Sequence, residues 1–168
     1  IEEKIDFDNM VAIGFSVGSA FTAKLSITDE VSNYFKGFIF ESSVNQKNEL
    51  SSILNQNPKK IIMVYGKDDE LIPYEGGKST NEMLDGYNYA SLDDVFSNWS
   101  TVNDCKTAES YKTDNYTIQH AKNCTKNTFV YSILFNNTGH NLDSDEVSSW
   151  NNTIETINYD SLAVNLLN

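Results

Sequence analysis

Ser16 lies at the centre of a G-x-S-x-G pentapeptide, Gly14-Phe15-Ser16-Val17-Gly18. An apolar run precedes the pentapeptide at residues 11–13, and a stretch that favours a helix follows it at residues 20–25. A serine in a sharp turn between a strand and a helix takes a strained backbone conformation that exposes its hydroxyl above the sheet. Gly14 and Gly18 are needed in such an elbow because a Cβ at either position would collide with the neighbouring strand and helix. The bare pentapeptide also occurs by chance, so the flanking elements carry the prediction of a nucleophile.

An acid and a histidine each follow a further predicted strand. Residues 60–65 form a short apolar run that breaks at Gly66, and Asp68 and Asp69 come soon after it. Residues 128–135 form a second such run, and His140 lies in the loop that follows. The C-terminal ends of parallel strands meet at the active-site edge of a sheet, so three strand ends are expected to converge on one site. The chain order is serine, acid, histidine, unlike the orders of chymotrypsin-type and subtilisin-type proteases.

This order and several longer motifs carry a resemblance to a known superfamily. The matching segments are Gly66-x-x-Asp69-x-x-Ile72-Pro73-Tyr74-x-Gly76-Gly77, Trp99-x-x-x-Asn103-x-Cys105 and Gly139-His140. Together with the serine pentapeptide, they make the chain resemble the carboxyl-terminal two-thirds of an α/β-hydrolase, in particular the polyhydroxybutyrate depolymerase and feruloyl esterase group of secreted esterases. The histidine loop departs from that group, which has a Gly-rich lead-in and a Trp-Pro after the histidine, whereas Asn141-Leu142 follow His140 here. The departure bears on substrate preference more than on catalysis.

The resemblance implies a catalytic triad of Ser16, His140 and Asp69. The Ser16 hydroxyl would attack an ester carbonyl, His140 would take its proton and pass it to the leaving alcohol, and Asp69 would hold the imidazole in the required tautomer. Asp69 fits the G-x-x-D spacing, which leaves Asp68 as a solvated loop acid. The backbone N–H of Val17 is one oxyanion donor by its position, and a second donor would come from an earlier loop. The resemblance implies neither a cofactor nor a metal ion.

Several other residues have simpler structural interpretations. His120, in the polar stretch bounded by the cysteines, is expected to be a surface side chain away from any strand end. Trp99 and Trp150 are expected to pack in the core or against helices. Tyr74 and the pair Gly76-Gly77 either shape the entrance of the site or only form the turn after a strand.

Cys105 and Cys124 lie 19 positions apart, without a metal-binding spacing. They are either free thiols in a reducing compartment or a disulfide; the resembling group has a disulfide in this region, which would stabilise the fold by about 3 kcal/mol in the chain-entropy model. Five N-glycosylation sequons begin at Asn98, Asn115, Asn123, Asn136 and Asn151. Chance alone supplies roughly four sequons in a chain this rich in Asn, Ser and Thr. We therefore expect a secreted or lumenal glycoprotein, chiefly because of the cysteines.

The overall charge limits the class of partner. The formal net charge of the chain is -12 at pH 7, and the sequence has no stripe of Lys or Arg that could neutralise phosphates. Nucleic acid and anionic membranes are therefore disfavoured as partners. The sequence also lacks an apolar run of the roughly 18 to 20 residues that a membrane helix requires. The expected partner is a small-molecule or polymeric ester substrate.

Alternating strands and helices predict one α/β domain over residues 1–168, with a mainly parallel sheet flanked by helices. The further elements expected are a helix through residue 29, a strand at 37–40, a polar helix at 49–54, a helix at 92–102, an irregular or hairpin segment between the cysteines, and a last helix at 145–167 capped by Asp143 or Ser144.

The length of the chain is short for a complete α/β-hydrolase, which needs roughly 200 to 300 residues. Only about ten residues precede the elbow strand. We expect the 168-residue chain to be a partial domain, either a fragment or a processed product, that lacks the N-terminal strands and the oxyanion loop. The missing N-terminal part of the same protein is then an expected partner. Because loss of one oxyanion donor typically lowers the rate by about 10² to 10³, we expect the chain alone to be inactive.

Three functions fit these observations. The first is a serine hydrolase that cleaves carboxylic esters through an acyl-enzyme intermediate. A non-catalytic structural or binding subunit of the same fold is the second; the missing front part favours it, and the presence of Ser16, Asp69 and His140 argues against it. The third is a serine peptidase, because this fold and triad host both chemistries and only substrate profiling separates them.

Overall fold

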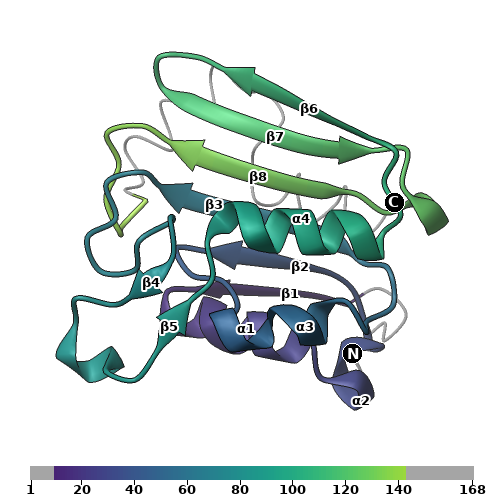
Figure 1. The fold of residues 1–168 in the computed structure, drawn as a ribbon, viewed down its shortest axis with the longest axis horizontal. Helices are drawn as coiled ribbons and strands as arrows, with labels where there is room; N and C mark the ends of the chain where they lie inside the picture. The colour runs from purple at the N-terminus through teal and green to yellow at the C-terminus, as the bar shows by residue number, and fades with distance from the viewer. Residues whose placement is uncertain (1–9, 143–168) are drawn as a thin grey trace, which may run out of the picture.

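The centre of the molecule is a six-stranded sheet in the order β1-β2-β3-β8-β7-β6 (Figure 1). This computed structural model describes residues 10–142. The strands are β1 (Met10–Phe15), β2 (Phe35–Glu41), β3 (Lys60–Gly66), β6 (Thr107–Lys112), β7 (Tyr116–Lys122) and β8 (Val130–Phe135). Strands β1, β2, β3 and β8 run parallel, and β7 pairs antiparallel with both β8 and β6. The predicted α/β fold with a mainly parallel sheet is confirmed.

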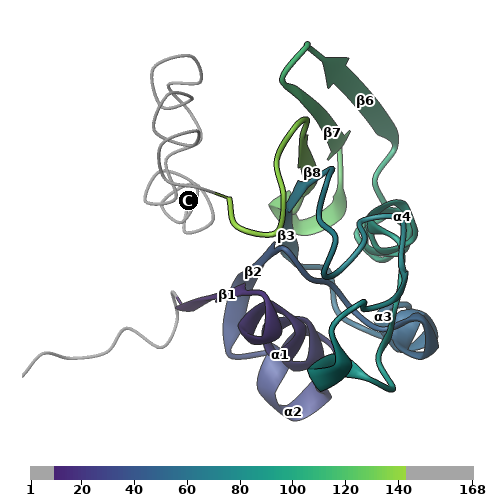
Figure 2. The same cartoon turned by 90° about the vertical axis from the view of Figure 1, so that its left-hand side faces the viewer.

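The α-helices within the described range lie on one face of this sheet, as the edge-on view shows (Figure 2). They are α1 (Val17–Ser26), α2 (Asp29–Ser32), α3 (Leu50–Ile53) and α4 (Leu92–Val102). A small antiparallel pair, β4 (Gly77–Lys78) and β5 (Asn88–Tyr89), lies in the connection between β3 and α4. Only Ser16 separates β1 from α1, so this turn places the C-terminal edge of the sheet beside the helical layer.

Successive side chains of a strand point to opposite sides, and in β2 and β3 the side chains on both sides are buried. Phe38 and Phe40 face the helices and pack in one hydrophobic cluster with Trp99 of α4, whereas Ile39 and Ile62 belong to a second cluster on the other face. All five side chains are 0% or 1% exposed. The near-continuous apolar runs that identify these strands in the sequence follow from burial on both sides.

Helix α4 has the bounds that the sequence predicts, and its ends show why. The Ser91 hydroxyl accepts a hydrogen bond from the Asp94 amide at 3.0 Å and caps the first turn. Beyond the last turn, the buried Asn103 side chain accepts a bond from the Lys59 amide and donates one to the Lys59 carbonyl, which joins the helix end to the start of β3. The predicted core position of Trp99 is confirmed.

The polar stretch between the cysteines forms the β6–β7 hairpin, so the hairpin alternative is correct. A disulfide joins Cys105 to Cys124 at the base of this hairpin. The surface position expected for His120 is wrong, because this residue lies within β7 and its half-buried ring stacks on Tyr131 with centroids 3.8 Å apart. The strand register imposes this position, since His120 lies opposite Tyr131 across the β7–β8 pair.

Two expected helices differ from the structure or lie outside it. The helix expected to reach residue 29 ends at Ser26, because the backbone becomes extended at Thr28 before α2 begins. The expected last helix at 145–167, its caps Asp143 and Ser144, and Trp150 lie outside the described residues.

Candidate active site

Three strand ends bring Ser16, Asp69 and His140 together. Ser16 directly follows β1, Asp69 lies three residues after β3, and His140 lies in the loop after β8. Because β1, β3 and β8 run parallel, their C-terminal ends meet at the same edge of the sheet (Figure 1). Side chains separated by 124 positions in the sequence are thereby in hydrogen-bond contact.

The turn at Ser16 has the strained conformation expected of an elbow. Ser16 has φ 54° and ψ −121°, and its amide donates to the Glu41 carbonyl at 2.9 Å. A Cβ on Gly14 would lie 2.3 Å from the Gly18 carbonyl oxygen, so only glycine fits at position 14. The same requirement predicted for Gly18 is wrong: a Cβ there would have no described atom within 4 Å, because Gly18 is exposed in the first turn of α1.

The His140 imidazole bridges the other two side chains. Its Nε2 lies 2.7 Å from Ser16 Oγ, and its Nδ1 lies 2.8 Å from Asp69 Oδ2. A carboxylate beside Nδ1 favours the tautomer with a proton on Nδ1, which leaves the Nε2 lone pair free to accept the serine proton. The Phe15 ring packs against the imidazole with centroids 5.4 Å apart. The arrangement can activate a serine hydroxyl for nucleophilic attack.

Asp69 and Asp68 have different environments although they are adjacent. The Asp69 side chain is fully buried, and its Oδ1 accepts the amides of Leu71 and Ile72 at 2.9 Å each. These bonds satisfy the buried carboxylate and fix its orientation toward the imidazole. Asp68 is exposed, and its amide donates to the Thr138 carbonyl in the histidine loop. Asp69 is thus the acid in contact with His140, and Asp68 is the solvated one.

Val17 is the first residue of α1. The first amides of a helix lack partners within the helix and carry the positive end of its dipole, so the Val17 N–H is available to a developing oxyanion. The loop expected to supply the second donor lies outside the described residues. Gly76 closes the turn that begins at Pro73, because its amide donates to the Pro73 carbonyl at 2.9 Å, and Gly77 begins β4; both glycines have positive φ, 82° and 109°.

The sequence does not point to Ser42, which also contacts the site. It directly follows β2, and its hydroxyl donates to the His140 backbone carbonyl at 2.9 Å. No motif marks it, because the contact joins residues 98 positions apart through the packing of the sheet. Its position just after a central strand is the only signal that could have drawn attention to it.

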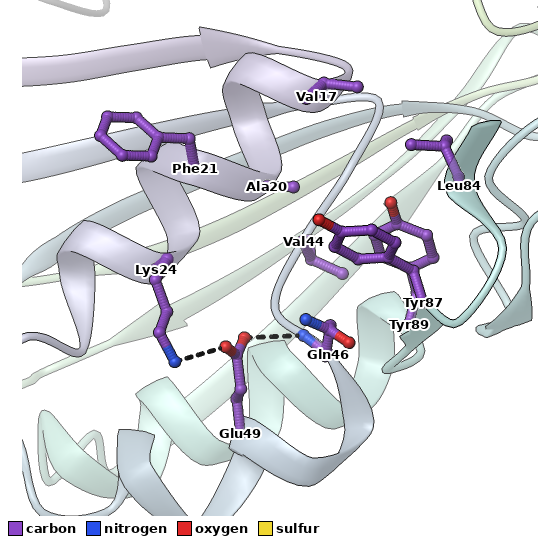
Figure 3. A pocket seen from close by; sticks show the side chains of 10 residues that line it. All are labelled: Val17, Ala20, Phe21, Lys24, Val44, Gln46, Glu49, Leu84, Tyr87 and Tyr89. Carbon is purple, nitrogen blue, oxygen red and sulfur yellow. Dashed lines mark hydrogen bonds and ion pairs between the residues drawn. The ribbon is translucent and has the colours of Figure 1, made fainter.

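A pocket of about 360 Å³ adjoins the site, between α1 and the segment that holds Tyr87 and Tyr89 (Figure 3). Val17 lines one end, and the ion pair between Lys24 and Glu49, with 2.8 Å between the charged atoms, lines the other. The rings of Tyr87 and Tyr89 stack with centroids 6.0 Å apart. Seven residues of helix separate the two ends, which corresponds to about 10 Å. Val17, which directly follows Ser16, connects the pocket to the elbow, and Ser16, Asp69 and His140 are not among the lining residues.

Residues 10–142 lack the features of two other kinds of site. Within that range, no group of three or more His, Cys, Asp or Glu side chains is arranged to hold a metal ion. None of the helices there combines the length and apolar character needed to cross a membrane.

Comparison with known proteins identifies the family. Residues 1–100, which contain the elbow and Asp69, match the sequence profile of the phospholipase/carboxylesterase family. No curated protein matches the chain. The matched segment covers more than half of the 168 residues and includes β1 and β3, whose ends carry Ser16 and Asp69, whereas His140 lies beyond it. The chain is therefore a member of the phospholipase/carboxylesterase family of α/β-hydrolases.

Proposed function

We propose that this protein is a serine hydrolase that cleaves carboxylic esters through a Ser16-His140-Asp69 triad. The observation that carries the proposal is the continuous chain of hydrogen-bond contacts from Ser16 Oγ through both imidazole nitrogens to the buried Asp69 carboxylate, at 2.7 and 2.8 Å. The strained backbone of Ser16 supports it, since such strain persists where the surrounding structure holds a functional group in place. Family membership supports the hydrolytic class of reaction.

The proposed reaction has two halves. Ser16 Oγ attacks the ester carbonyl carbon while His140 Nε2 takes the hydroxyl proton. The oxyanion that forms accepts a hydrogen bond from the Val17 N–H. The carbon–oxygen bond to the alcohol then breaks, and the imidazolium gives its proton to the departing oxygen, which leaves an acyl-enzyme. Water, deprotonated by His140, attacks the acyl carbon and releases the acid and Ser16. Asp69 stabilises the imidazolium in both halves.

The pocket in Figure 3 supports an uncharged substrate group next to the ester. Its charged residues, Lys24 and Glu49, neutralise each other, and Glu49 also accepts the Gln46 amide at 3.0 Å. A charged substrate group in this pocket would lose its hydration and would find no unpaired charge of opposite sign among the lining residues, which is unfavourable. The tyrosine pair and the exposed Val17 side chain offer apolar contact area. Neutral esters are therefore the proposed substrates, within the polyhydroxybutyrate depolymerase and feruloyl esterase group that the sequence resembles.

Secretion is part of the proposal. The Cys105–Cys124 disulfide supports it, because disulfides persist mainly in oxidising compartments. Two of the sequon asparagines, Asn115 and Asn123, are exposed at the ends of β7 and would be open to glycosylation.

The test compares ester and peptide substrates on the full-length protein and on Ser16→Ala. We expect turnover of p-nitrophenyl acetate and butyrate, none of chromogenic peptide anilides, and loss of ester turnover in Ser16→Ala with unchanged thermal unfolding. Peptide cleavage without ester cleavage would instead identify a peptidase. A folded protein inert toward both classes would identify a non-catalytic module.

A further inference from the structure

The end of β2 contacts all three segments that carry the proposed triad. This strand lies between β1 and β3 in the sheet (Figure 1). The Glu41 carbonyl accepts the Ser16 amide at 2.9 Å, and the Ser42 amide donates to the carbonyl of Val64, in β3, at 2.9 Å. Since β3 leads into the loop of Asp69, these two hydrogen bonds attach the turn at Ser16 and the strand before Asp69 to the dipeptide Glu41-Ser42.

The Ser42 side chain adds the third segment. Its hydroxyl donates to the His140 backbone carbonyl at 2.9 Å and is fully buried. The backbone of Ser42 has φ 54°, a left-handed conformation that is uncommon for residues other than glycine. This strain turns the chain just past β2, where the hydroxyl contacts the histidine loop. The bond to Ser42 and the ring contact with Phe15 thus hold the backbone and the side chain of His140 from two directions.

We infer that Ser42 is a positioning residue that sets the distance between His140 and Ser16; the inference rests on the proposed function. Glu41 binds the Ser16 backbone and Ser42 binds the His140 backbone. Both residues of the 2.7 Å contact between His140 Nε2 and Ser16 Oγ are therefore attached to the same dipeptide. Without the hydroxyl, the His140 carbonyl loses this donor and the loop can move away from the elbow. Displacements of about 1 Å in an active site lower rates by about 10²-fold.

Two substitutions separate the hydroxyl from the backbone strain. Ser42→Ala removes the hydroxyl and keeps the strain, whereas Ser42→Gly removes the hydroxyl and relieves the strain, because glycine adopts positive φ readily. Ser43→Ala is the matched control: Ser43 is equally buried and adjacent, but its hydroxyl interacts with the Tyr65 and Tyr89 hydroxyls and makes no hydrogen bond to Ser16, Asp69 or His140. Its backbone carbonyl, which accepts the Ser19 hydroxyl at 2.7 Å, is unchanged by the substitution.

The measurement is kcat and KM on p-nitrophenyl butyrate, together with the rate at which a fluorophosphonate labels Ser16. We expect both Ser42 variants to lower kcat and the labelling rate by about 10- to 100-fold with KM within about threefold, and Ser43→Ala to match the wild type. Rates within threefold of wild type in both Ser42 variants would overturn the inference. Lower rates in Ser42→Ala but not in Ser42→Gly would also overturn the inference, because the backbone strain at residue 42, and not the missing hydroxyl, would then cause the loss.

The same data distinguish the inference from the function on which it rests. A full-length wild-type protein that hydrolyses no ester and takes no label overturns the proposed function, and the inference with it. A reactive wild type with equally reactive Ser42 variants overturns the inference alone. A raised KM with unchanged kcat in the Ser42 variants also contradicts positioning, because it would show a loss of substrate binding.

Discussion

At the scale of single residues, two adjacent acids follow β3 and only Asp69 contacts a histidine. Its carboxylate is buried and accepts the Leu71 and Ile72 amides as well as the contact with His140. We expect Asp69→Asn to lower kcat by about 10⁴, because an amide at this place favours the wrong imidazole tautomer. Asp68→Asn, the matched control, should change kcat by less than about threefold, since Asp68 is exposed. Steady-state kinetics on a neutral ester measure both; equal losses in the two variants would contradict the assignment.

The two glycines of the pentapeptide give a second matched pair. A Cβ on Gly14 would lie 2.3 Å from a backbone oxygen and 2.5 Å from Thr22 Oγ1, whereas a Cβ on Gly18 would enter open space among the described residues. We expect Gly14→Ala to reduce the free energy of unfolding by about 3 kcal/mol or more. Gly18→Ala should be neutral or should stabilise by up to about 1 kcal/mol, because alanine favours a helix. Denaturant unfolding of both variants tests this, and an equal loss in the two would show that Gly18 is also confined.

The residues of the site could be predicted to different degrees. Ser16, Asp69 and His140 stand in local motifs at the ends of apolar runs, so sequence pattern and strand topology locate them. Ser42 has no such motif, because its contact with His140 depends on how the end of β2 packs beside the loop after β8. Local patterns report local geometry and do not report contacts between distant segments.

At the scale of secondary-structure elements, the same limit appears in β6 and β7. Helix α4 could be predicted because a capping serine and a repeat of apolar residues define it. Every residue of β6 is exposed, so it lacks the alternation of apolar and polar residues that identifies a half-buried strand. The β6–β7 pairing, and with it the position of His120, follows from registry with β8.

The β7 strand also provides a pH-dependent prediction. Burial, and secondly the charge of Lys122, lower the pKa of His120, while Glu109 opposes the shift. Near pH 6.5 the unfolded chain therefore binds a proton at this histidine more strongly than the folded protein does, and the folded state loses stability as pH falls through this range. Between about pH 7.5 and about pH 5.5, we expect the free energy of unfolding of the wild type to decrease relative to that of His120→Gln.

Urea titrations of the two proteins at each pH measure the difference. The comparison cancels the contributions of His140 and the carboxylates, which both proteins share. A difference in unfolding free energy that is independent of pH would contradict a lowered pKa at His120.

At the scale of the whole molecule, the net charge of -12 bears on substrate choice. A strongly negative protein repels anionic esters, and salt screens this repulsion over a Debye length of about 10 Å at 0.1 M. Raising NaCl from about 0.02 M to about 0.5 M should increase kcat/KM for the anionic p-nitrophenyl hemisuccinate by roughly 3- to 10-fold. The value for neutral p-nitrophenyl butyrate should stay within about 1.5-fold. Equal salt responses of the two esters would show that net charge has no part in selectivity.

The central claim is that Ser16 is a nucleophile activated by His140, whose Nε2 lies 2.7 Å from Ser16 Oγ and whose Nδ1 lies 2.8 Å from Asp69 Oδ2. Fluorophosphonate labelling of the natively isolated protein, followed by mass spectrometry of the intact chain and of its peptides, tests this most directly. The account predicts one adduct, on the peptide that contains Ser16, and none after heat denaturation. A folded protein that takes no label, or takes it on another residue, would contradict the account.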